Sequence, residues 1–509
     1  MVIDLAYISG VDRNQAAIIS LDQYVDENNI CRVIDAFVNS IDFKEMGFKY
    51  SQPKDTGRPP FDPAAMMKLY IYGNLYRIRS SRRLEAETLR NVEAMWLMNG
   101  LTPDDKTISN FRKDNRKALK EVFRLFNKLC IKLELFGKET EAIDGSKIKA
   151  DNSRRHHYTQ KDTEKMLSAL DKKVAQYLEE LDCNDKSEDG DPRPDREAIE
   201  AALEKLAGRK SELEAILAEI KKNDGKPVCT VDEDAALMKQ SGGKGYDVCY
   251  NVQTAVDEKN GLIVDFNVTN NANDFGELSD MVGRSMEMLG VDKLNVLADT
   301  GYSKGEEIDA SEKAGATCYI PKAKPSHQPD NELFNRGNFK YDAESNTYTC
   351  PAGNAMPQVR IRERDGFKVY ANRAACMVCK VKDQCTKSKI LREIERSPYQ
   401  ENIDRAAQNA EENPNIYQRR MELSEHPFGV VKRIWGFGQF LCRGKEMATG
   451  EMAMAFMAFN LRRAVNILGV KKLVEAINSA ASSVGGSLAS MGCSIIPLFE
   501  ALFRVARLV

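Results

Sequence analysis

The sequence is poor in histidine, and its few histidines are badly placed to bind a metal together. Only four occur, at positions 156, 157, 327 and 426. They do not form a set with the spacing of metal ligands. His426 directly follows Glu425 and is expected to cap or pack there. A metal centre built on histidine is therefore not indicated.

An overall excess of positive charge is also missing. The 509 residues include 74 Lys and Arg against 76 Asp and Glu, a formal net charge of −2. No global basic field therefore indicates nucleic acid. The charge is uneven, however, because residues 57–120 contain 13 Lys and Arg and 7 Asp and Glu, a local balance of +6. Such a patch can attract phosphates, and it is equally consistent with a solvated helical face.

Signals for export or for membrane insertion are absent as well. The first 20 residues contain Asp4 and Asp12 and have no basic start followed by an apolar core, so no signal peptide is expected. Residues 476–499 carry no charge, but six serines, three glycines, Asn478 and Pro497 make them a poor spanning helix. We expect a packed or loosely ordered tail. Most of the twelve cysteines lie singly in apolar runs, which suits free thiols in a reducing, cytoplasmic compartment.

The N-terminal part of the chain has the pattern of a helical domain. A chain of this length exceeds one compact core, so several domains are expected. Residues 1–56 suggest mixed helix, and Asp62-Pro63 predicts a helix start, because Asp caps well and proline fits the first turn. Further helices are expected at Ser81–Asn91 and Thr107–Phe136. Short helices, brief turns and surface arginines are compatible with a helix-turn-helix-like DNA module.

The middle of the chain combines strands with a long charged insert. A strand is expected at 141–150. Residues 158–181 and 196–222 then have helix-forming composition, and the breaker-rich stretch 183–194 between them predicts an antiparallel helical hairpin. The hairpin is either an arm for DNA or a partner subunit, or a solvated spacer.

After the insert, strand signals dominate. The expected elements are strands at 246–256 and 262–269, a helix at about 275–289, a strand ending at Asp299, a helix at about 303–314, a strand at 316–321, and helices at about 402–434 and 446–468. Two antiparallel strands followed by alternating strands and helices predict a mixed sheet with helices on its faces.

Three acids far apart in the chain stand where a fold can bring them together. Asp144 lies inside the first strand, Asp299 ends another, and Glu425 lies in a helical stretch. Neighbouring strands can set Asp144 beside Asp299, and a helix over the sheet can add Glu425. Carboxylate oxygens suit Mg²⁺, and a pair of such ions supports in-line displacement at phosphorus. For each acid alone, polar surface is the simpler interpretation.

Basic residues near these acids could face a phosphate. Lys432 lies seven positions after Glu425, about two helical turns and so on the same face. Arg420 precedes Glu425 by five positions, roughly 140° around the helix. Arg154 and Arg155 follow the first strand and predict a phosphate-facing loop.

Residues 323–400 are polar, basic and irregular, and they contain four cysteines. Cys350, Cys376, Cys379 and Cys385 have the spacing C-x25-C-x2-C-x5-C. The tight pair favours a structural zinc ion in tetrahedral thiolate coordination. The alternative is four reduced cysteines in a small basic subdomain, since the first cysteine lies far from the pair.

Several separate runs of the sequence resemble the DDE transposases of bacterial insertion sequences. The runs are Gly57–Leu69, Thr107–Arg112, Ile143-Asp-Gly-Ser146, Gly245–Asp257, Ala298-Asp-Thr-Gly-Tyr302, Tyr417-x2-Arg420-x4-Glu425-x6-Lys432, Arg443-Gly444 and Asn460-Leu-Arg462. Together they span about 57–468. Between Arg420 and Glu425 the chain has one residue more than the commonest spacing of the family, so Glu422, Glu446 and Glu451 stay open as rival third ligands.

The resemblance implies an RNase H-like α/β core, a mixed sheet flanked by helices, with an N-terminal all-α domain, an inserted helical hairpin and a small cysteine-containing insert. The implied parts are a DNA-binding and dimerisation domain at 1–136, the core at 137–157 and 241–322, the hairpin at 158–240, the cysteine insert at 323–400, the catalytic helices at 401–468 and a tail at 469–509.

The resemblance also implies a function. Asp144, Asp299 and Glu425 would hold two Mg²⁺ ions, for which Mn²⁺ can substitute. A homodimer or higher assembly would bind the terminal inverted repeats of its element, cleave the ends and join them to target DNA, in association with the nucleoid. The expected DNA contacts are Tyr417, Arg420, Lys432, Arg154, Arg155, Arg82, Arg83 and Arg112. The alternatives are an inactive DNA-binding regulator on the same scaffold and a host metal-dependent nuclease.

Overall fold

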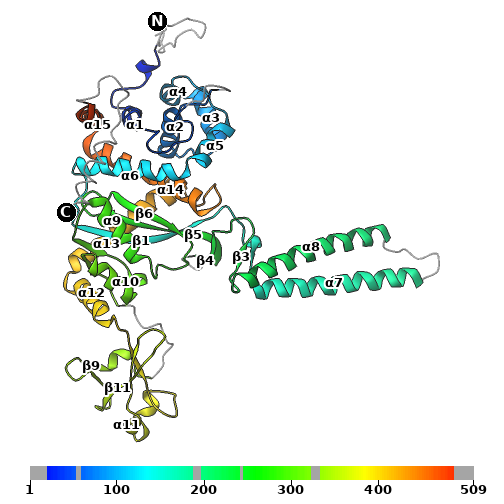
Figure 1. The fold of residues 1–509 in the computed structure, drawn as a ribbon, viewed down its shortest axis with the longest axis vertical. Coiled ribbons are helices and arrows are strands. Elements are labelled where there is room, and N and C mark those ends of the chain that lie inside the picture. Colours follow the sequence, from blue (N-terminus) through cyan, green and yellow to red (C-terminus); the bar gives the residue numbers. More distant parts are fainter. Residues whose placement is uncertain (1–19, 53–58, 187–195, 241–244, 323–332, 486–509) are drawn as a thin grey trace, which may run out of the picture. The chain divides into compact units, whose positions relative to one another are not determined.

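The structure is a computed structural model that describes residues 20–52, 59–186, 196–240, 245–322 and 333–485. By their internal contacts the residues divide into two compact units, Met1–Leu133 with Gly450–Val509, and Glu134–Thr449. The described part of the first unit is helical, and the second combines sheets with helices (Figure 1).

The first unit is a set of short packed helices. They are α1 Ile30–Asn39, α2 Pro63–Leu75, α3 Ser81–Arg90, α4 Val92–Leu97, α5 Asp105–Asp114, α6 Arg116–Lys132, most of α14 Lys445–Leu468, and α15 Val470–Gly485. The predicted start of α2 is confirmed, because the Asp62 carboxylate accepts the amide of Ala64 and Pro63 occupies the first turn. Residues 1–19 and 53–58, part of the predicted mixed helix, lie outside the described residues.

The prediction of one helix over Thr107–Phe136 is wrong, because α5 and α6 are separated at Asn115. The buried Asn115 amide donates to the carbonyl of Phe111 at 2.8 Å and accepts the backbone amide of Lys49 at 2.7 Å. A side chain that bonds the backbone in this way competes with continued helix. Since Lys49 lies 66 residues away in the chain, local sequence does not reveal the break.

The second unit is built on a mixed sheet, as predicted, and its six strands include one, β4, that was not predicted. The strands are β1 Thr140–Lys149, β4 Ala236–Lys239, β5 Tyr246–Asp257, β6 Ile263–Thr269, β7 Leu294–Leu297 and β8 Ala316–Tyr319. β1 lies at the centre, antiparallel to β5 on one side and parallel to β7 on the other, and β8 continues parallel to β7. β4 and β6 pair with different stretches of the outer edge of β5.

Helices cover both faces of this sheet. α9 Leu278–Leu289 packs on β5 and β6, α10 Gly305–Lys313 and α12 Gln400–Glu412 pack on β8, and α13 Pro414–Phe428 packs on β1 and β5. Buried Glu141 of β1 interacts with Ser285 of α9, and burial raises the pKa of Glu141 to about 8. Asp144 is three residues further along β1. Because side chains alternate along a strand, Asp144 faces away from α9.

The predicted continuous helix at 402–434 is also wrong. α12 ends at Glu412, Asn413 leaves helical geometry, and Pro414 begins α13. Proline lacks an amide hydrogen and disfavours helical geometry in the residue before it, so a new helix starts there. After Phe428 the backbone widens into a π-helical turn at Gly429–Ile434.

The inserted hairpin forms as expected. Its helices are α7 Gln160–Lys186 and α8 Arg196–Lys222, and β2 His157–Tyr158 pairs with β3 Val228–Cys229 at its base. A small apolar cluster that includes Tyr158, Leu213 and Ile220 joins the helices. Lys210 and Asp171 pair across them at 2.7 Å. Most of the breaker-rich stretch between the helices lies outside the described residues.

The cysteine-containing insert is more regular than predicted. It forms a five-stranded antiparallel sheet of β9 Lys340–Asp342, β10 Thr347–Thr349, β11 Ala355–Ile361, β12 Lys368–Tyr370 and β13 Ile394–Arg396, with α11 Arg373–Met377. Most of these strands have three residues, too few to show the alternation by which a strand is recognised in sequence. Residues 323–332 lie outside the described residues.

The C-terminal segment contains a helix where only a tail was expected. α15 reaches Gly485, and residues 486–509 lie outside the described part of the chain. Within the described ranges, every helix is too short or too polar to cross a membrane.

Candidate functional site

Two of the three predicted acids lie side by side at the centre of the sheet. β1 and β7 run parallel with Ala142 opposite Leu297. Continuing this register by two residues sets Asp144 beside Asp299, the second residue after the end of β7. Burial raises the pKa of Asp144 to about 6, and the negative charge of Asp299 adds to the rise. The two carboxylates are thus close enough to repel each other when both are ionised.

Helix α13 lies over Asp144 and presents polar side chains to it. The charge of Arg420 and the hydroxyl of Ser424 both lower the pKa of Asp144, against the larger effect of burial. Tyr417 donates from its hydroxyl to the carbonyl of Ala298 at 3.4 Å, and the Arg420 guanidinium lies 5.9 Å from the Tyr417 ring centre. The side of α13 that carries Tyr417, Arg420 and Ser424 therefore faces Asp144 of β1 and Ala298, the residue after β7.

Glu425 lies next to this side of α13. Ser424 is fully buried, whereas the side chain of Glu425 is exposed one position later. Of the rival acids, Glu422 and Glu446 are also exposed, and Glu451 is buried in the first unit with Arg79 at 2.5 Å. The structure thus sets Ser424 toward Asp144 and leaves Glu425 at the solvent side of the same helix.

Lys432 reaches back to the strand that carries Asp144. Its ammonium donates to the carbonyl of Lys147 at 2.6 Å and to the Ser146 hydroxyl at 3.2 Å. It belongs to the π-helical turn after α13, a geometry that is often found at functional sites. A cation is therefore placed along β1, two to three residues beyond Asp144.

A further acid, Asp274, fills the hollow behind Asp144. Its Oδ1 atom accepts from the Asn251 amide at 2.9 Å and the Gln253 amide at 2.6 Å, both on β5. A Cβ atom on Gly145 would collide with Asp274 Oδ1 and Gln253 Nε2. Sequence reasoning missed Asp274, because an acid just before an expected helix is typical of an ordinary cap.

Tyr302 joins this group to the loop that carries Asp299. Its buried hydroxyl donates to Gln253 Oε1, and its backbone amide donates to the Asp299 carbonyl at 3.2 Å. The Asp299 carboxylate itself accepts the amide of Gly301 at 2.7 Å. Burial and then the charge of Asp274 raise the pKa of Tyr302. Asp274, Gln253 and Tyr302 thus connect β5, the loop before α9 and the loop after β7 behind Asp144.

The donor set at this site fits a hard divalent cation. Asp144 and Asp299 offer carboxylate oxygens, the ligands that Mg²⁺ prefers. A cation between them would offset both the burial and the repulsion that raise the pKa of Asp144. In the described ranges, however, no three His, Cys, Asp or Glu side chains are already arranged around a metal position. Two acids therefore converge, and the third oxygen ligand is not in place in this conformation.

The predicted DNA-contacting arginines occupy different environments. Arg154 and Arg155 are exposed on the turn after β1. In the first unit, Arg82 and Arg83 are exposed at the start of α3. The Nε atom of Arg82 lies 3.2 Å from the Oδ2 atom of Asp105 in α5. Between these two helices lies an open groove of about 580 Å³, which is lined by Ser80, Ser81, Arg82, Asp105, Lys106, Ser109 and Asn110. Arg112 is instead half-buried and lines a small cavity with Arg79 and Glu451.

Comparison with known families identifies the class of protein. Residues 19–114 match a family described as transposase domain (DUF772), and residues 349–465 match one described as transposase DDE domain. No curated protein matches the chain. Both matches are to transposase domains, and together they support a DDE transposase of the insertion-sequence type, as the resemblance predicted.

The hollow at Gly145 gives a test of the site. In Gly145→Ala the new methyl group collides with Asp274 and Gln253, so β1 must shift beside Asp144. We expect the variant to be less stable by about 1–3 kcal/mol, the usual cost of overpacking, and so to have a lower melting temperature. Gly283→Ala in α9 is the matched control, because a Cβ atom there meets no neighbour. A wild-type melting temperature for Gly145→Ala would contradict the close approach of Asp274 to β1.

The environment of Asp144 predicts a stability change that depends on pH. Its folded pKa of about 6 exceeds the value of about 3.9 for an unfolded chain, so ionised Asp144 disfavours folding. Without divalent cations, Asp144→Asn should therefore raise the melting temperature. The gain should reach its full size above about pH 6 and should vanish near pH 4. Thermal unfolding of both proteins in the presence of a chelator, from pH 4 to pH 7, measures this gain.

The exposed acid Asp292 supplies the control for this measurement, as Asp292→Asn. An Asp144→Asn gain of equal size at pH 4 and pH 7 would show that it arises from packing and not from the charge of Asp144.

Proposed function

We propose that this transposase binds the terminal inverted repeats of its insertion sequence, cleaves DNA at the element ends and joins them to target DNA. The observation that carries the proposal is the adjacent placement of Asp144 and Asp299 on parallel strands, with the polar side of α13 over them. Paired carboxylates suit the metal-dependent phosphoryl transfer that cleavage and joining require.

We assign the core sheet to the RNase H-like class. Three antiparallel strands, β6, β5 and β1, are followed by β7 and β8 parallel to β1. This order supports the assignment, and so does the helix α13 packed over the central strand. In the proposed division of labour, the helical unit binds the element ends and the sheet unit contains the chemistry. A dimer or higher assembly would pair two ends.

Asp144, Asp299 and Glu425 are the proposed ligands. When bound, two Mg²⁺ or Mn²⁺ ions would activate the attacking oxygen and neutralise charge on the phosphate and the leaving oxygen. Asp144 and Asp299 are fixed by the register of β1 and β7. Glu425 is solvent-exposed beside Ser424, so its side chain has the freedom to turn toward the site when cation and DNA arrive.

The basic residues of the site would hold the phosphate. Arg420, whose charge already reaches Asp144, offers a planar fork of donors that suits phosphate oxygens. Lys432 adds a point charge beside Ser146 and Lys147. Tyr417 would position the DNA from the start of α13. Arg154 and Arg155 are proposed to contact the backbone outside the cleavage point.

In the first unit, Arg82 and Arg83 are the proposed contacts with the inverted repeats. Both are exposed, and Arg82 lines the open groove between α3 and α5. Arg112 is half-buried in a cavity with Arg79 and Glu451, a place that favours a packing role over contact with DNA.

Single substitutions of the three acids test the proposed chemistry. Asp144→Ala, Asp299→Ala and Glu425→Ala should each reduce cleavage of a duplex that contains the element end by more than about 100-fold. The reason is that removing a metal ligand lowers activity more than removing a residue that only supports a ligand, which costs about 10–100-fold. End binding in a gel-shift assay should persist. Glu422→Ala, an exposed acid on the same helix, is the matched control for Glu425. Undiminished cleavage by Asp144→Ala would refute the assignment.

The wild-type protein in the same assay separates the alternatives. A regulator without catalytic activity would bind the ends and leave them intact with Mg²⁺ or Mn²⁺, and a host nuclease would cut unrelated duplexes equally well. The proposed transposase cuts at the ends and joins them to a second DNA.

The arginines at the start of α3 give a separate prediction for DNA binding. Arg82→Ala and Arg83→Ala should weaken binding to all sequences alike, because a phosphate contact is lost. The slope of log affinity against log salt should fall by about 0.9 for each contact. Arg90→Ala is the control, because Arg90 stands at the other end of α3 and pairs with Glu87. An unchanged slope would place the DNA elsewhere on the unit.

A further inference from the structure

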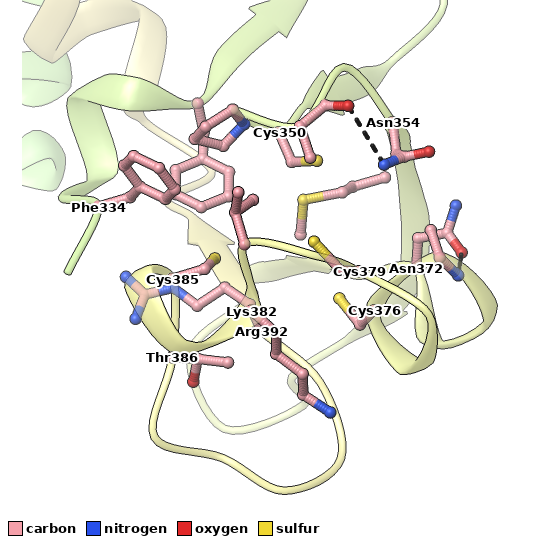
Figure 2. Close-up of a pocket in the computed structure, with 16 residues that line it drawn as sticks. Phe334, Cys350, Asn354, Asn372, Cys376, Cys379, Lys382, Cys385, Thr386 and Arg392 are labelled. Atoms are coloured by element: carbon pink, nitrogen blue, oxygen red, sulfur yellow. Dashed lines mark hydrogen bonds between the residues drawn. The ribbon is translucent and has the colours of Figure 1, made fainter.

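The four cysteines of the insert come together around one cavity. Cys350 follows β10, Cys376 lies in α11, Cys379 follows that helix, and Cys385 follows a short turn at Lys382–Gln384. All four line the same space (Figure 2). The other three are separated from Cys350 by at least 25 residues, which include β11 and β12. The fold, and not the local spacing, therefore assembles the group.

The four cysteines bound one small cavity together with Lys382 and Arg392. All four cysteines are free and half-buried. The cavity between them measures about 30 Å³, enough for a water molecule or a single ion and too small for an organic ligand.

Local backbone hydrogen bonds hold three of the four cysteines in place. After Cys350 the chain turns tightly, with the Gly353 amide donating to the Cys350 carbonyl at 2.8 Å and the Cys350 amide donating to the Asn354 carbonyl at 3.0 Å. Gly353 has φ of +80°, which favours glycine. The backbone amide of Cys376 donates to the carbonyl of Asn372, and the backbone amide of Cys385 donates to the carbonyl of Lys382.

The small size of the insert explains why a metal would matter. Among its described residues, one small apolar cluster joins five buried side chains, Phe339, Tyr348, Met356, Tyr370 and Ile394, with Cys350 and Cys385 packed against it. Most strands of its sheet have three residues. Domains with so little apolar core usually need a cross-link or a metal to be stable.

We propose that Cys350, Cys376, Cys379 and Cys385 bind one structural zinc ion. The ion would tie the β10–β11 turn to α11 and to the segment before β13. A zinc ion with four thiolates has a net charge of −2, and Lys382 and Arg392, which line the same cavity, supply compensating positive charge. Since the described side chains are not already arranged around a metal, binding would draw the sulfur atoms inward to about 2.3 Å from zinc.

Metal analysis of the full chain, purified under reducing conditions without chelator, tests the proposal. About one zinc per chain is expected in the wild type. Replacement by Co²⁺ should give the thiolate-to-cobalt absorption and the visible bands of a tetrahedral site. Cys376→Ser with Cys379→Ser should lose the metal, while Thr386→Ala, which changes another wall of the cavity, should keep it. Hydrogen exchange should increase within 334–396 when zinc is removed.

A second variant covers the case in which the double variant does not fold. Histidine can replace cysteine as a zinc ligand, so Cys385→His should retain one zinc and change the absorption of the Co²⁺ form. An unchanged spectrum would remove Cys385 from the ligand set. Zinc-free wild type with reduced thiols, or disulfides among the four cysteines in the purified protein, would overturn the proposal, whatever the outcome of the cleavage assays.

Discussion

The parallel pairing of β1 with β7 is the constraint on which the site depends. It sets Asp144 beside Asp299 at the centre of the second unit, where burial and the neighbouring charge raise the pKa of Asp144 to about 6. Burial and that charge make ionised Asp144 unfavourable for the folded state at neutral pH, so the pair is not kept there for stability. A cation that neutralises the two acids, as proposed above, would account for the arrangement, and the matches to transposase domains support this explanation.

The residues behind β1 keep that pairing rigid. Asp274, Gln253 and Tyr302 link β5, the loop before α9 and the loop that carries Asp299. Gly145 allows Asp274 to approach the strand, since any larger side chain would occupy the same space. The glycine after Asp144 is thus required by packing on the opposite face of β1, and the distance between the two acids depends on atoms that contact neither substrate nor cation.

Sequence alone predicted the elements that have clear periodicity, including β1, β5, β6 and the two helices of the inserted hairpin. From the strands it also predicted that Asp144 and Asp299 can lie side by side. It could not predict features that depend on distant partners. The break at Asn115 depends on Lys49, and the role of Asp274 depends on amides of β5. The rotation of α13, which turns Ser424 toward Asp144 and leaves Glu425 exposed, depends on where Pro414 restarts the helix. A motif identifies the acid but not its orientation.

The two metal sites that we infer differ in ligand chemistry, and this difference separates their roles. Hard carboxylate oxygens at the sheet suit Mg²⁺, which binds weakly and exchanges with water, as an ion that meets the substrate must. Soft thiolates in the insert suit zinc, and four of them leave no open position for a substrate. The first site is expected to fill when DNA phosphate adds its oxygens. The second would fill as the insert folds, because its small core has little else to stabilise it.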